Sequence, residues 1–364
     1  MLLANPHLLW SDLFLWYEAQ LTAPGIDAYG ASLVGVPVLN IAFNDYQGWT
    51  HTVNTHDGWD AYELTLANGG YQFDGKVRAF ETEEQILKVR QTDGTLRQEP
   101  LIVRRSVHGP IIGEKDGKAI ALRVVGLDQP GGLEEWWDMA RAKNLSEFEA
   151  ALKRLQIPMF TVMYADRDGH ILHLFNGQVP VRTQGDFESW SSIIPGNTSA
   201  TLWTKTHPYR ELPRVLDPPS GWLQNANDPP WTTTFPSAIN PDNYPAYMAP
   251  RTGMGFRPQR SAHMLAEDKQ ISFEEADDLG LFRTLWFVPS EDQRFEAIGG
   301  ESYVAVIEFS NPVRAMALMS YGNATQPEAL GRGEQLKLFA SKKLRPVWRS
   351  RQEIEAHLTS LVRF

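Results

Sequence analysis

The first half of the chain consists of short apolar and β-branched runs separated by turn signals. These runs are residues 36–43, 84–90, 101–107 and 119–125. Asn44-Asp45 follows the first run, and Asp93-Gly94 and Asp116-Gly117 separate the later ones. Runs of this length between Asp-Gly turns predict antiparallel strands joined as hairpins.

The second half mixes helical and strand patterns. Residues 145–155 carry apolar side chains at helical spacing after Asn144 and Glu147, a capping-box pair, and Pro158 ends the pattern. Residues 160–177 and 303–322 each predict a strand hairpin, residues 195–258 a long shaped loop, and residues 335–364 one or two helices. The pattern predicts a layered α+β domain of antiparallel sheets with helices outside.

Composition narrows the class of protein. The chain has 364 residues, 42% of them hydrophobic, and a net charge of −10, which excludes intrinsic disorder and argues against a nucleic-acid partner. It has no cysteine, which excludes disulfides, zinc–thiolate sites and thiol nucleophiles. No apolar run is long enough to span a bilayer, and the first ten residues lack the pattern of a signal peptide.

Four places carry candidate chemistry, and each has a structural alternative. His7 is either a site residue or a structural histidine. Asp57 and Asp60 offer hard oxygen ligands for calcium, or belong to a polar turn. Asn227 offers an amide to a developing oxyanion, or forms a turn. Glu308 interrupts an apolar strand, so it is either buried with a partner or faces water at a sheet edge.

The residues alone indicate a β-rich protein with an aromatic-lined cleft, either a hydrolase or a binding protein. The chain has 12 Trp and 24 Pro but no nucleophile elbow, phosphate-binding loop, dinucleotide fingerprint or zinc-protease helix. Its tryptophans and carboxylates also raise a carbohydrate-binding or glycosidase function. A glycosidase needs two carboxylates flanking one bond, and the sequence shows no such pair in a recognisable setting.

Six segments occur in an order that resembles a known family. They are LLANPHLLW, TAPGIDAYGASLVGVPVLNIAFND, GWTHTVNT, VHGPII, YADRDGHI and PSGWLQNANDPPW. Together they are similar to the β chain of the penicillin acylase family, which includes cephalosporin acylases and acyl-homoserine-lactone acylases. The segments MLLANPH and WTHTV are most similar to the lactone acylases. The resemblance covers residues 1–272 and resumes over residues 280–364.

This resemblance implies an N-terminal-nucleophile hydrolase with an αββα sandwich of antiparallel sheets. The whole chain, 1–364, would be a single β-chain domain with an apparent deletion near 272–283. In the family, a precursor cleaves itself so that a serine becomes the first residue of the β chain. That serine hydroxyl attacks an amide carbonyl, and its α-amino group acts as base. The resemblance further implies a small acyl amide as substrate, an α chain as partner, no required cofactor, and a periplasmic or secreted location.

The resemblance also assigns catalytic roles. His7 matches the histidine beside the nucleophile, and Glu308 matches the acidic residue that orients it in cephalosporin-type members. Val53 matches the backbone N–H donor of the oxyanion hole, and Asn227 matches its side-chain donor. We expect these four residues to surround one small volume, with His7 within hydrogen-bond reach of Glu308, directly or through one water.

Further roles follow from the same resemblance. Arg257 matches an arginine that braces the site, with Arg260 as the alternative. Leu8, Met159 and Phe160 match residues on the acyl side. All three are apolar, so we expect them to hold an acyl tail rather than a charged group.

The last implied features concern a metal and the nucleophile. Asp57 and Asp60 match positions where some penicillin acylases hold a structural calcium, the third carboxylate lying on the α chain. In the family, the nucleophilic serine precedes the LLANPH segment, and this sequence begins inside that segment. We therefore expect the polypeptide as written to be inactive by itself. The alternative is a non-catalytic acyl-binding protein that retains the pocket.

Overall fold

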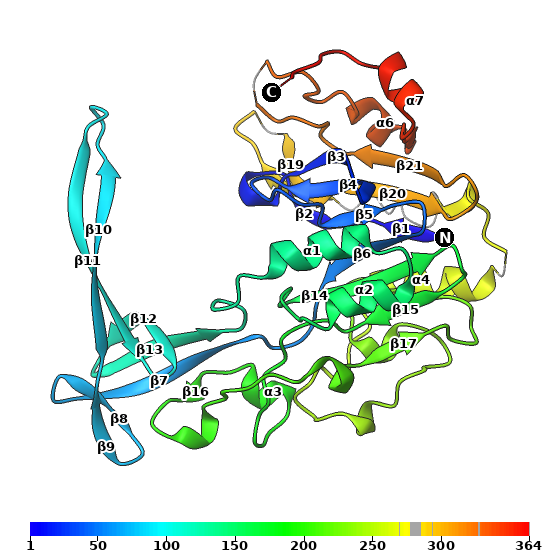
Figure 1. Cartoon of the computed structure of the whole chain (residues 1–364). Coiled ribbons are helices and arrows are strands. Elements are labelled where there is room, and N and C mark those ends of the chain that lie inside the picture. The colour runs from blue at the N-terminus through cyan, green and yellow to red at the C-terminus, as the bar shows by residue number, and fades with distance from the viewer. Residues whose placement is uncertain (269, 277–284, 293, 327, 364) are drawn as a thin grey trace.

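Two antiparallel sheets lie face to face in the body of the protein (Figure 1). A computed structural model describes residues 1–268, 270–276, 285–292, 294–326 and 328–363. The larger sheet has the order β17 (Arg214–Leu216), β15 (Ile171–Leu174), β14 (Phe160–Asp166), β6 (Gln47–Val53), β5 (Ile41–Phe43), β4 (Ile26–Leu33), β3 (Trp16–Ala23). The smaller has the order β1 (Leu2–Ala4), β20 (Tyr303–Glu308), β21 (Arg314–Met319), β22 (Arg345–Pro346).

Strand β20 shows why its sequence is apolar throughout. Successive side chains on a strand point to opposite faces of the sheet. Tyr303, Ala305 and Ile307 face the seven-stranded sheet, whereas Val304 and Val306 pack on the opposite face. Both faces of β20 are therefore buried, which requires a continuous apolar run instead of alternation.

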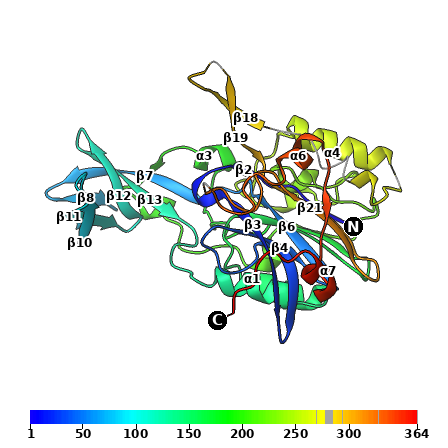
Figure 2. The ribbon, with the colours of Figure 1, turned by 90° about the horizontal axis from the view of Figure 1, so that it is seen from above.

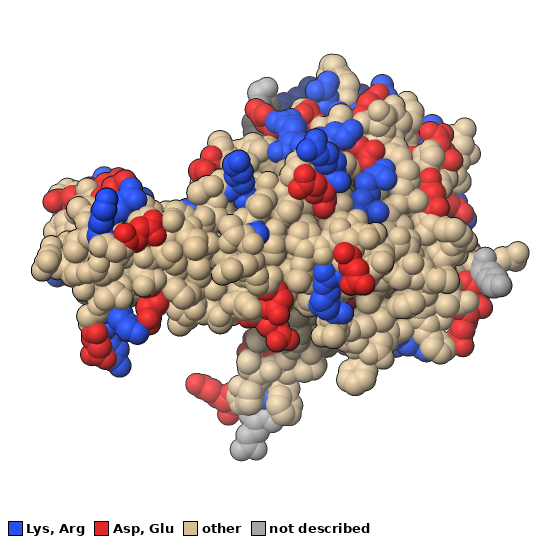
Figure 3. Space-filling view, turned by 90° about the horizontal axis from the view of Figure 1, so that it is seen from below, with Lys and Arg blue, Asp and Glu red and all other residues tan. Residues whose placement is uncertain are grey.

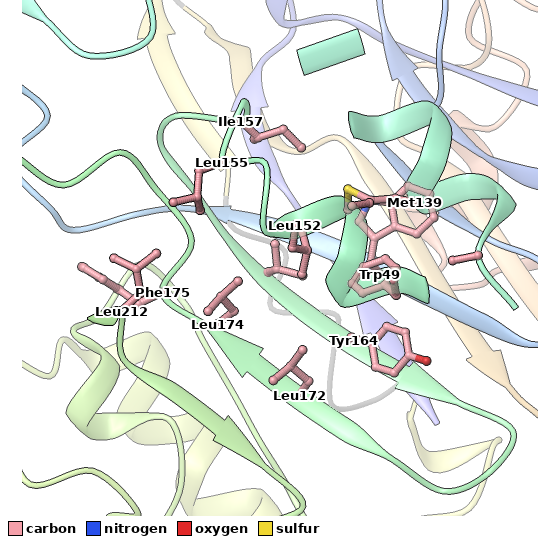
Figure 4. Close-up of a cluster of buried hydrophobic side chains, with 14 of the residues drawn as sticks. Trp49, Met139, Leu152, Leu155, Ile157, Tyr164, Leu172, Leu174, Phe175 and Leu212 are labelled. Atoms are coloured by element: carbon pink, nitrogen blue, oxygen red, sulfur yellow. The ribbon is translucent and has the colours of Figure 1, made fainter. Parts of the chain in front are cut away.

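Helices cover the outer faces of both sheets. On the seven-stranded sheet, α1 (Gly132–Arg141) and α2 (Leu145–Leu152) pack over Trp49 and Tyr164 (Figure 4). On the four-stranded sheet, Phe339 of α6 (Leu336–Ala340) packs against β20 and β21. The layers run helix, sheet, sheet, helix, which agrees with the predicted antiparallel α+β sandwich.

Smaller elements surround this body. A three-stranded sheet has the order β18 (Leu285–Pro289), β19 (Phe295–Glu301), β2 (His7–Leu9). The other helices among the described residues are α3 (Phe187–Trp190), α4 (Phe256–Glu267) and α7 (Arg351–Ala356). Between residues 195 and 255 the chain forms only short 3-10 turns and β17, as the loop prediction requires.

A fourth sheet extends from the body, and we call it the arm (Figures 1 and 2). Its order is β10 (Glu81–Arg90), β11 (Leu96–Ser106), β12 (Gly109–Lys115), β13 (Lys118–Val124), β7 (Trp59–Ala67), β8 (Gly70–Phe73), β9 (Lys76–Ala79). The short strand β16 (Ile194–Pro195) pairs in parallel with β7. The predicted Asp-Gly turns join β10 to β11 and β12 to β13.

Three local expectations differ from the structure. The strand predicted over 36–43 is realised only as β5, because the Ser32 hydroxyl donates to Val38 O at 2.6 Å and closes residues 36–40 into a turn. The helix predicted to residue 155 ends at Leu152, and Leu155 has a φ of 49°, which is left-handed. The apparent deletion near 272–283 falls largely on residues 277–284, which lie outside the described residues.

The surface carries charges of both signs. On the face shown in Figure 3, Lys and Arg side chains are interspersed with Asp and Glu. Within the described ranges, no helix has the length and apolar character needed to cross a bilayer. The mixed surface charge agrees with a sequence of 34 Lys and Arg against 44 Asp and Glu, and the helices agree with its lack of long apolar runs.

Glu135 generates a pH-dependent stability prediction. Its carboxylate is buried in α1 and accepts a hydrogen bond from Gln156 N at 2.6 Å. Burial raises the pKa of Glu135 from 4.5 to about 7. The folded protein therefore holds a proton that the unfolded chain releases, so stability falls as pH rises from 4.5 to about 7.

We predict that Glu135→Gln removes this slope and raises the free energy of unfolding at about pH 8 by roughly 3 kcal/mol. Urea unfolding at about pH 5 and pH 8 measures it. Glu188→Gln, at an exposed carboxylate, is the control and leaves the slope unchanged. Equal pH slopes for the wild type and Glu135→Gln would contradict the prediction.

Candidate active site

A cavity of about 1110 Å³ opens where β6, β14, β2, α4 and the loop 219–227 meet. Seven of the eight residues predicted for catalysis or acyl binding line it. They are His7, Leu8, Val53, Met159, Phe160, Asn227 and Arg257. These residues come from five separate parts of the chain, so their convergence favours the site interpretation over the structural alternatives for His7 and Asn227.

Val53 stands at the end of β6, and its peptide groups face away from β14. Asn54 N–H donates to Met159 O at 3.0 Å, so Asn54 and Met159 form a hydrogen-bonded pair. Val53 lies opposite Phe160 in the next, non-hydrogen-bonded pair. Its C=O accepts instead from Asn227 Nδ2 at 3.1 Å, and its N–H lies on the same edge of β6.

The Asn227 amide is held in one orientation. Arg257 Nη2 donates to Asn227 Oδ1 at 2.9 Å, and a guanidinium can only donate, so the amide oxygen must face it. The amide nitrogen therefore faces Val53. One of its two hydrogens bonds to Val53 O, and the other remains available. The expected oxyanion donors, Val53 N–H and Asn227 Nδ2, are thus adjacent.

Polar contacts preorganise the loop that carries Asn227. Asn225 Oδ1 accepts from Thr52 Oγ1 at 2.5 Å and from Asn227 N at 3.1 Å. Asp228 is buried and accepts from Ala226 N at 2.7 Å. Burial also raises the pKa of Asp228. Neither Thr52 nor Asp228 was predicted as a supporting residue, although Asp228 belongs to the same Asn-Asp-Pro turn as Asn227.

His7 presents a bare acceptor nitrogen. Its Nδ1 lies 3.0 Å from Asn5 O, and because a carbonyl only accepts, Nδ1 carries the hydrogen. Nε2 is buried and has no hydrogen-bond partner among the described residues. Burial, and then the positive charge of Arg257, lower the pKa of His7. The ring is therefore neutral at neutral pH and can accept a hydrogen bond or a proton.

Glu308 is placed differently from the expectation. The β1–β20 register sets Leu2 opposite Ile307, so Glu308 lies at the Met1 end of β1, away from His7. Its carboxylate accepts from Arg314 Nη1 at 3.2 Å and does not line the cavity. The expected direct contact with His7 is therefore not formed.

The carboxylate beside His7 belongs to Glu301. It is fully buried, lies opposite His7 in the β19–β2 register, and its charge acts to raise the pKa of His7. Asn5 Nδ2 donates to Glu301 Oε1 at 3.2 Å. No sequence pattern points to Glu301, since it follows two glycines outside the apolar run. For the bracing arginine, Arg257 lines the cavity and Arg260 does not.

Asp57 and Asp60 face an arginine. Arg182 Nη2 lies 3.0 Å from Asp57 Oδ2 and 3.3 Å from Asp60 Oδ2, and the Arg182 side chain is 1% exposed. Trp203 Nε1 donates to Asp60 as well. Burial raises the pKa of Asp60 to about 6, against the opposing charge of Arg182.

These residues do not fit the calcium site that the resemblance implies. A guanidinium already supplies the positive charge between the two carboxylates. Asp57, Asp60 and Arg182 instead form an ion cluster between the arm strand β7 and the body.

We predict that Arg182→Gln lowers the free energy of unfolding by about 3–5 kcal/mol, because it removes the guanidinium that pairs with the buried Asp60 and the largely buried Asp57. For the same reason, calcium or a chelator should leave the wild-type melting temperature unchanged. Thermal melts with and without calcium measure both effects. Arg210→Gln, at an 84% exposed side chain, is the matched control. A wild-type melting temperature that rises with calcium would contradict the assignment.

Comparisons with known proteins place these features in context. An acyl-homoserine lactone acylase PvdQ from Pseudomonas putida is 33% identical over 258 residues, 64% of this chain and 33% of the relative. PvdQ from Pseudomonas syringae pv. tomato is 35% identical over the same shares. Aculeacin-A acylase from Actinoplanes utahensis is 25% identical over 72% of this chain and 37% of its own length. The chain spans about a third of the length of these relatives.

A solved structure shares the fold. Thermostable penicillin G acylase from Alcaligenes faecalis superposes with a TM-score of 0.71 at 14% identity, covering 100% of this chain and 96% of that one. At this identity the likeness speaks for the fold alone. The sequence profile of the family Penicillin amidase matches residues 1–281. Because that match covers most of the chain, and the six segments predicted it, the chain belongs to the penicillin amidase family.

Proposed function

We propose that the cavity is the amide-hydrolysing site of an acylase. The substrate is an amide between an acyl group and an amine, of the kind found in acyl-homoserine lactones or β-lactam side chains. The observation that carries the proposal is the pairing of two oxyanion donors, Val53 N–H and Asn227 Nδ2, at the cavity wall.

The donors act on charge that develops during the reaction. When a nucleophile attacks the amide carbon, the carbonyl oxygen becomes an oxyanion between Val53 N–H and the free hydrogen of Asn227 Nδ2. Arg257 and Asn225 hold these donors in place beforehand, so no reorganisation is needed as the charge forms. One such donor typically contributes about 2.7–4 kcal/mol to the barrier reduction.

The nucleophile is assigned from the resemblance. The hydroxyl side chains that line the cavity are Thr50, Thr52, Tyr164, Ser220 and Ser261. None of them bonds to His7 Nε2 in the described residues. We therefore assign attack to the family serine that precedes the LLANPH segment, with His7 Nε2 as a nearby acceptor. On this proposal the 364-residue polypeptide binds an acyl amide but hydrolyses it only together with that serine segment and the α chain.

The acyl group is assigned to the apolar wall. Leu8, Met159 and Phe160 line the cavity together with Trp222 and Phe235. This wall offers apolar area and carries no charged side chain among these five residues, which suits a hydrocarbon tail. The periplasmic or secreted location implied by the resemblance is part of the same proposal.

We predict that Asn227→Ala, in the protein extended by its serine segment and α chain, lowers kcat about 100- to 1000-fold. The reason is the loss of one oxyanion donor. Release of homoserine lactone from a long-chain N-acyl-homoserine lactone, followed by mass spectrometry, measures it. Asn197→Ala, at an exposed loop residue outside the cavity, is the matched control.

Comparing the 364-residue polypeptide with its extended form distinguishes an acylase from a non-catalytic acyl-binding protein. An acylase chain of this kind binds the acyl amide without turnover and gains turnover when extended. A non-catalytic acyl-binding protein binds the same ligand and stays inactive when extended. Undiminished hydrolysis by Asn227→Ala would contradict the role of Asn227 as an oxyanion donor. Hydrolysis by the 364-residue polypeptide without the extension would contradict the assignment of the family serine as the nucleophile.

We predict that Met159→Lys weakens binding of a long-chain acyl amide to the 364-residue polypeptide by at least about tenfold. A charged group would have to lose its hydration against the acyl tail. Isothermal titration calorimetry measures the dissociation constant. Met159→Leu conserves apolar volume and should change it less than about threefold. Equal affinities for the Lys and Leu variants would show that the tail lies elsewhere.

A further inference from the structure

The β10–β11 hairpin of the arm is a two-stranded ribbon with little support. Its ladder runs from Glu81–Arg105 to Arg90–Leu96, but β11 pairs with β12 only at Arg105 and Ser106. The ribbon stands clear of the rest of the chain (Figure 1). An isolated two-stranded ribbon is only marginally stable in water, and additional strands stabilise it.

The exposed side chains of β10 include a pair of apolar residues. Ile86 is 51% exposed and Leu87 is 43% exposed, at the middle of the strand. Ile86 lies opposite Pro100 of β11 on the same face. Apolar area at a free strand edge is a template for pairing with another strand.

The two free edges of the ribbon are not equivalent. Pro100 stands in the middle of β11 and has no N–H to donate, so a further strand cannot pair along that edge without interruption. Strand β10 has no proline and is the terminal strand of the arm sheet. A partner strand therefore adds to β10.

Charges on β10 are arranged for a second copy of the same strand. Glu81, Glu83 and Glu84 lie in its first half, and Lys88 and Arg90 in its second half. An antiparallel copy brings the acidic half of each strand beside the basic half of the other. Glu83 is already paired with Arg105 at 3.3 Å, whereas Glu84 and Lys88 have no ion-pair partner among the described residues.

Symmetry restricts the register of such a pair. Residues that face each other must point to the same face of the sheet, so a two-fold axis perpendicular to the sheet passes through a residue position. Centres far from the middle of β10 leave much of it unpaired. Centring on Gln85 sets Glu84 opposite Ile86 and Thr82 opposite Lys88. Centring on Ile86 sets Glu84 opposite Lys88 twice and Ile86 opposite its own copy.

We infer that two copies of this chain associate through antiparallel β10 strands centred on Ile86. The two ribbons form one four-stranded sheet across the dimer. On one face, Pro100 and Ile86 of each copy make a continuous apolar strip, flanked by two symmetric Glu84–Lys88 pairs. The antiparallel arrangement sets the tip of each ribbon beside the base of the other, so the two bodies lie at opposite ends. This surface is separate from the proposed acylase cavity.

Charge reversal tests the register directly. Glu84→Lys creates two Lys–Lys pairs across the dimer, and Lys88→Glu creates two Glu–Glu pairs. Each variant should weaken self-association at least about tenfold. An equimolar mixture of the two variants restores both opposite-charge pairs and should form a heterodimer. The double variant Glu84→Lys/Lys88→Glu should dimerise like the wild type.

Sedimentation velocity of the full chain across a concentration series measures association, and circular dichroism confirms that each variant is folded. Lys115→Glu, at the exposed end of β12, changes the net charge by the same amount as Lys88→Glu and should leave association unchanged. A monomeric wild type at the highest concentration would overturn the proposal. So would single variants that still dimerise, or a mixture of the two variants that stays monomeric.

Discussion

The register of β6 against β14 is the constraint on which the candidate site depends. The hydrogen bond from Asn54 N–H to Met159 O fixes which residues of β6 bond to β14 and which face the other way. A slip of one residue would turn the Val53 peptide towards β14 and remove it from the cavity. Trp49, fully buried on the same strand, opposes such a slip, since its indole N–H donates to Asn40 O at 2.8 Å.

The site is assembled at the edge of a rigid sandwich rather than within it. Strand β6 supplies a backbone donor, and a loop more than 150 residues further along the chain supplies a side-chain donor. That loop is held by Asn225 and by the buried Asp228 rather than by a sheet ladder. Side-chain hydrogen bonds to the backbone hold this loop in place, and strand pairing holds Val53 in place. The Val53 N–H and the Asn227 amide are therefore fixed relative to each other.

Buried charges follow a common rule in this chain. The buried Arg182 guanidinium meets Asp57 and Asp60, and the buried Glu135 carboxylate accepts a hydrogen bond from Gln156 N. A charge withdrawn from water needs a partner of opposite charge or strong hydrogen-bonding capacity. The β10–β11 ribbon of the arm differs, because Glu84 and Lys88 are exposed to solvent there. Charges there govern which surfaces associate rather than which side chains pack.

Much of the local structure follows from the sequence. The Asp-Gly turns and β-branched runs determine the hairpins of the arm, and Asn144 determines where α2 begins, because these signals act over a few residues. Six ordered segments identified the family, and the resemblance picked out His7, Val53, Asn227 and Arg257, which line one cavity. Tertiary structure alone decided that Glu301, not Glu308, lies beside His7, since that depends on which strands pair and in which register. It also decided that Arg182 neutralises Asp57 and Asp60, because the guanidinium comes from more than 120 residues away. No local pattern encodes such a contact; it forms only when the arm and the body fold against each other.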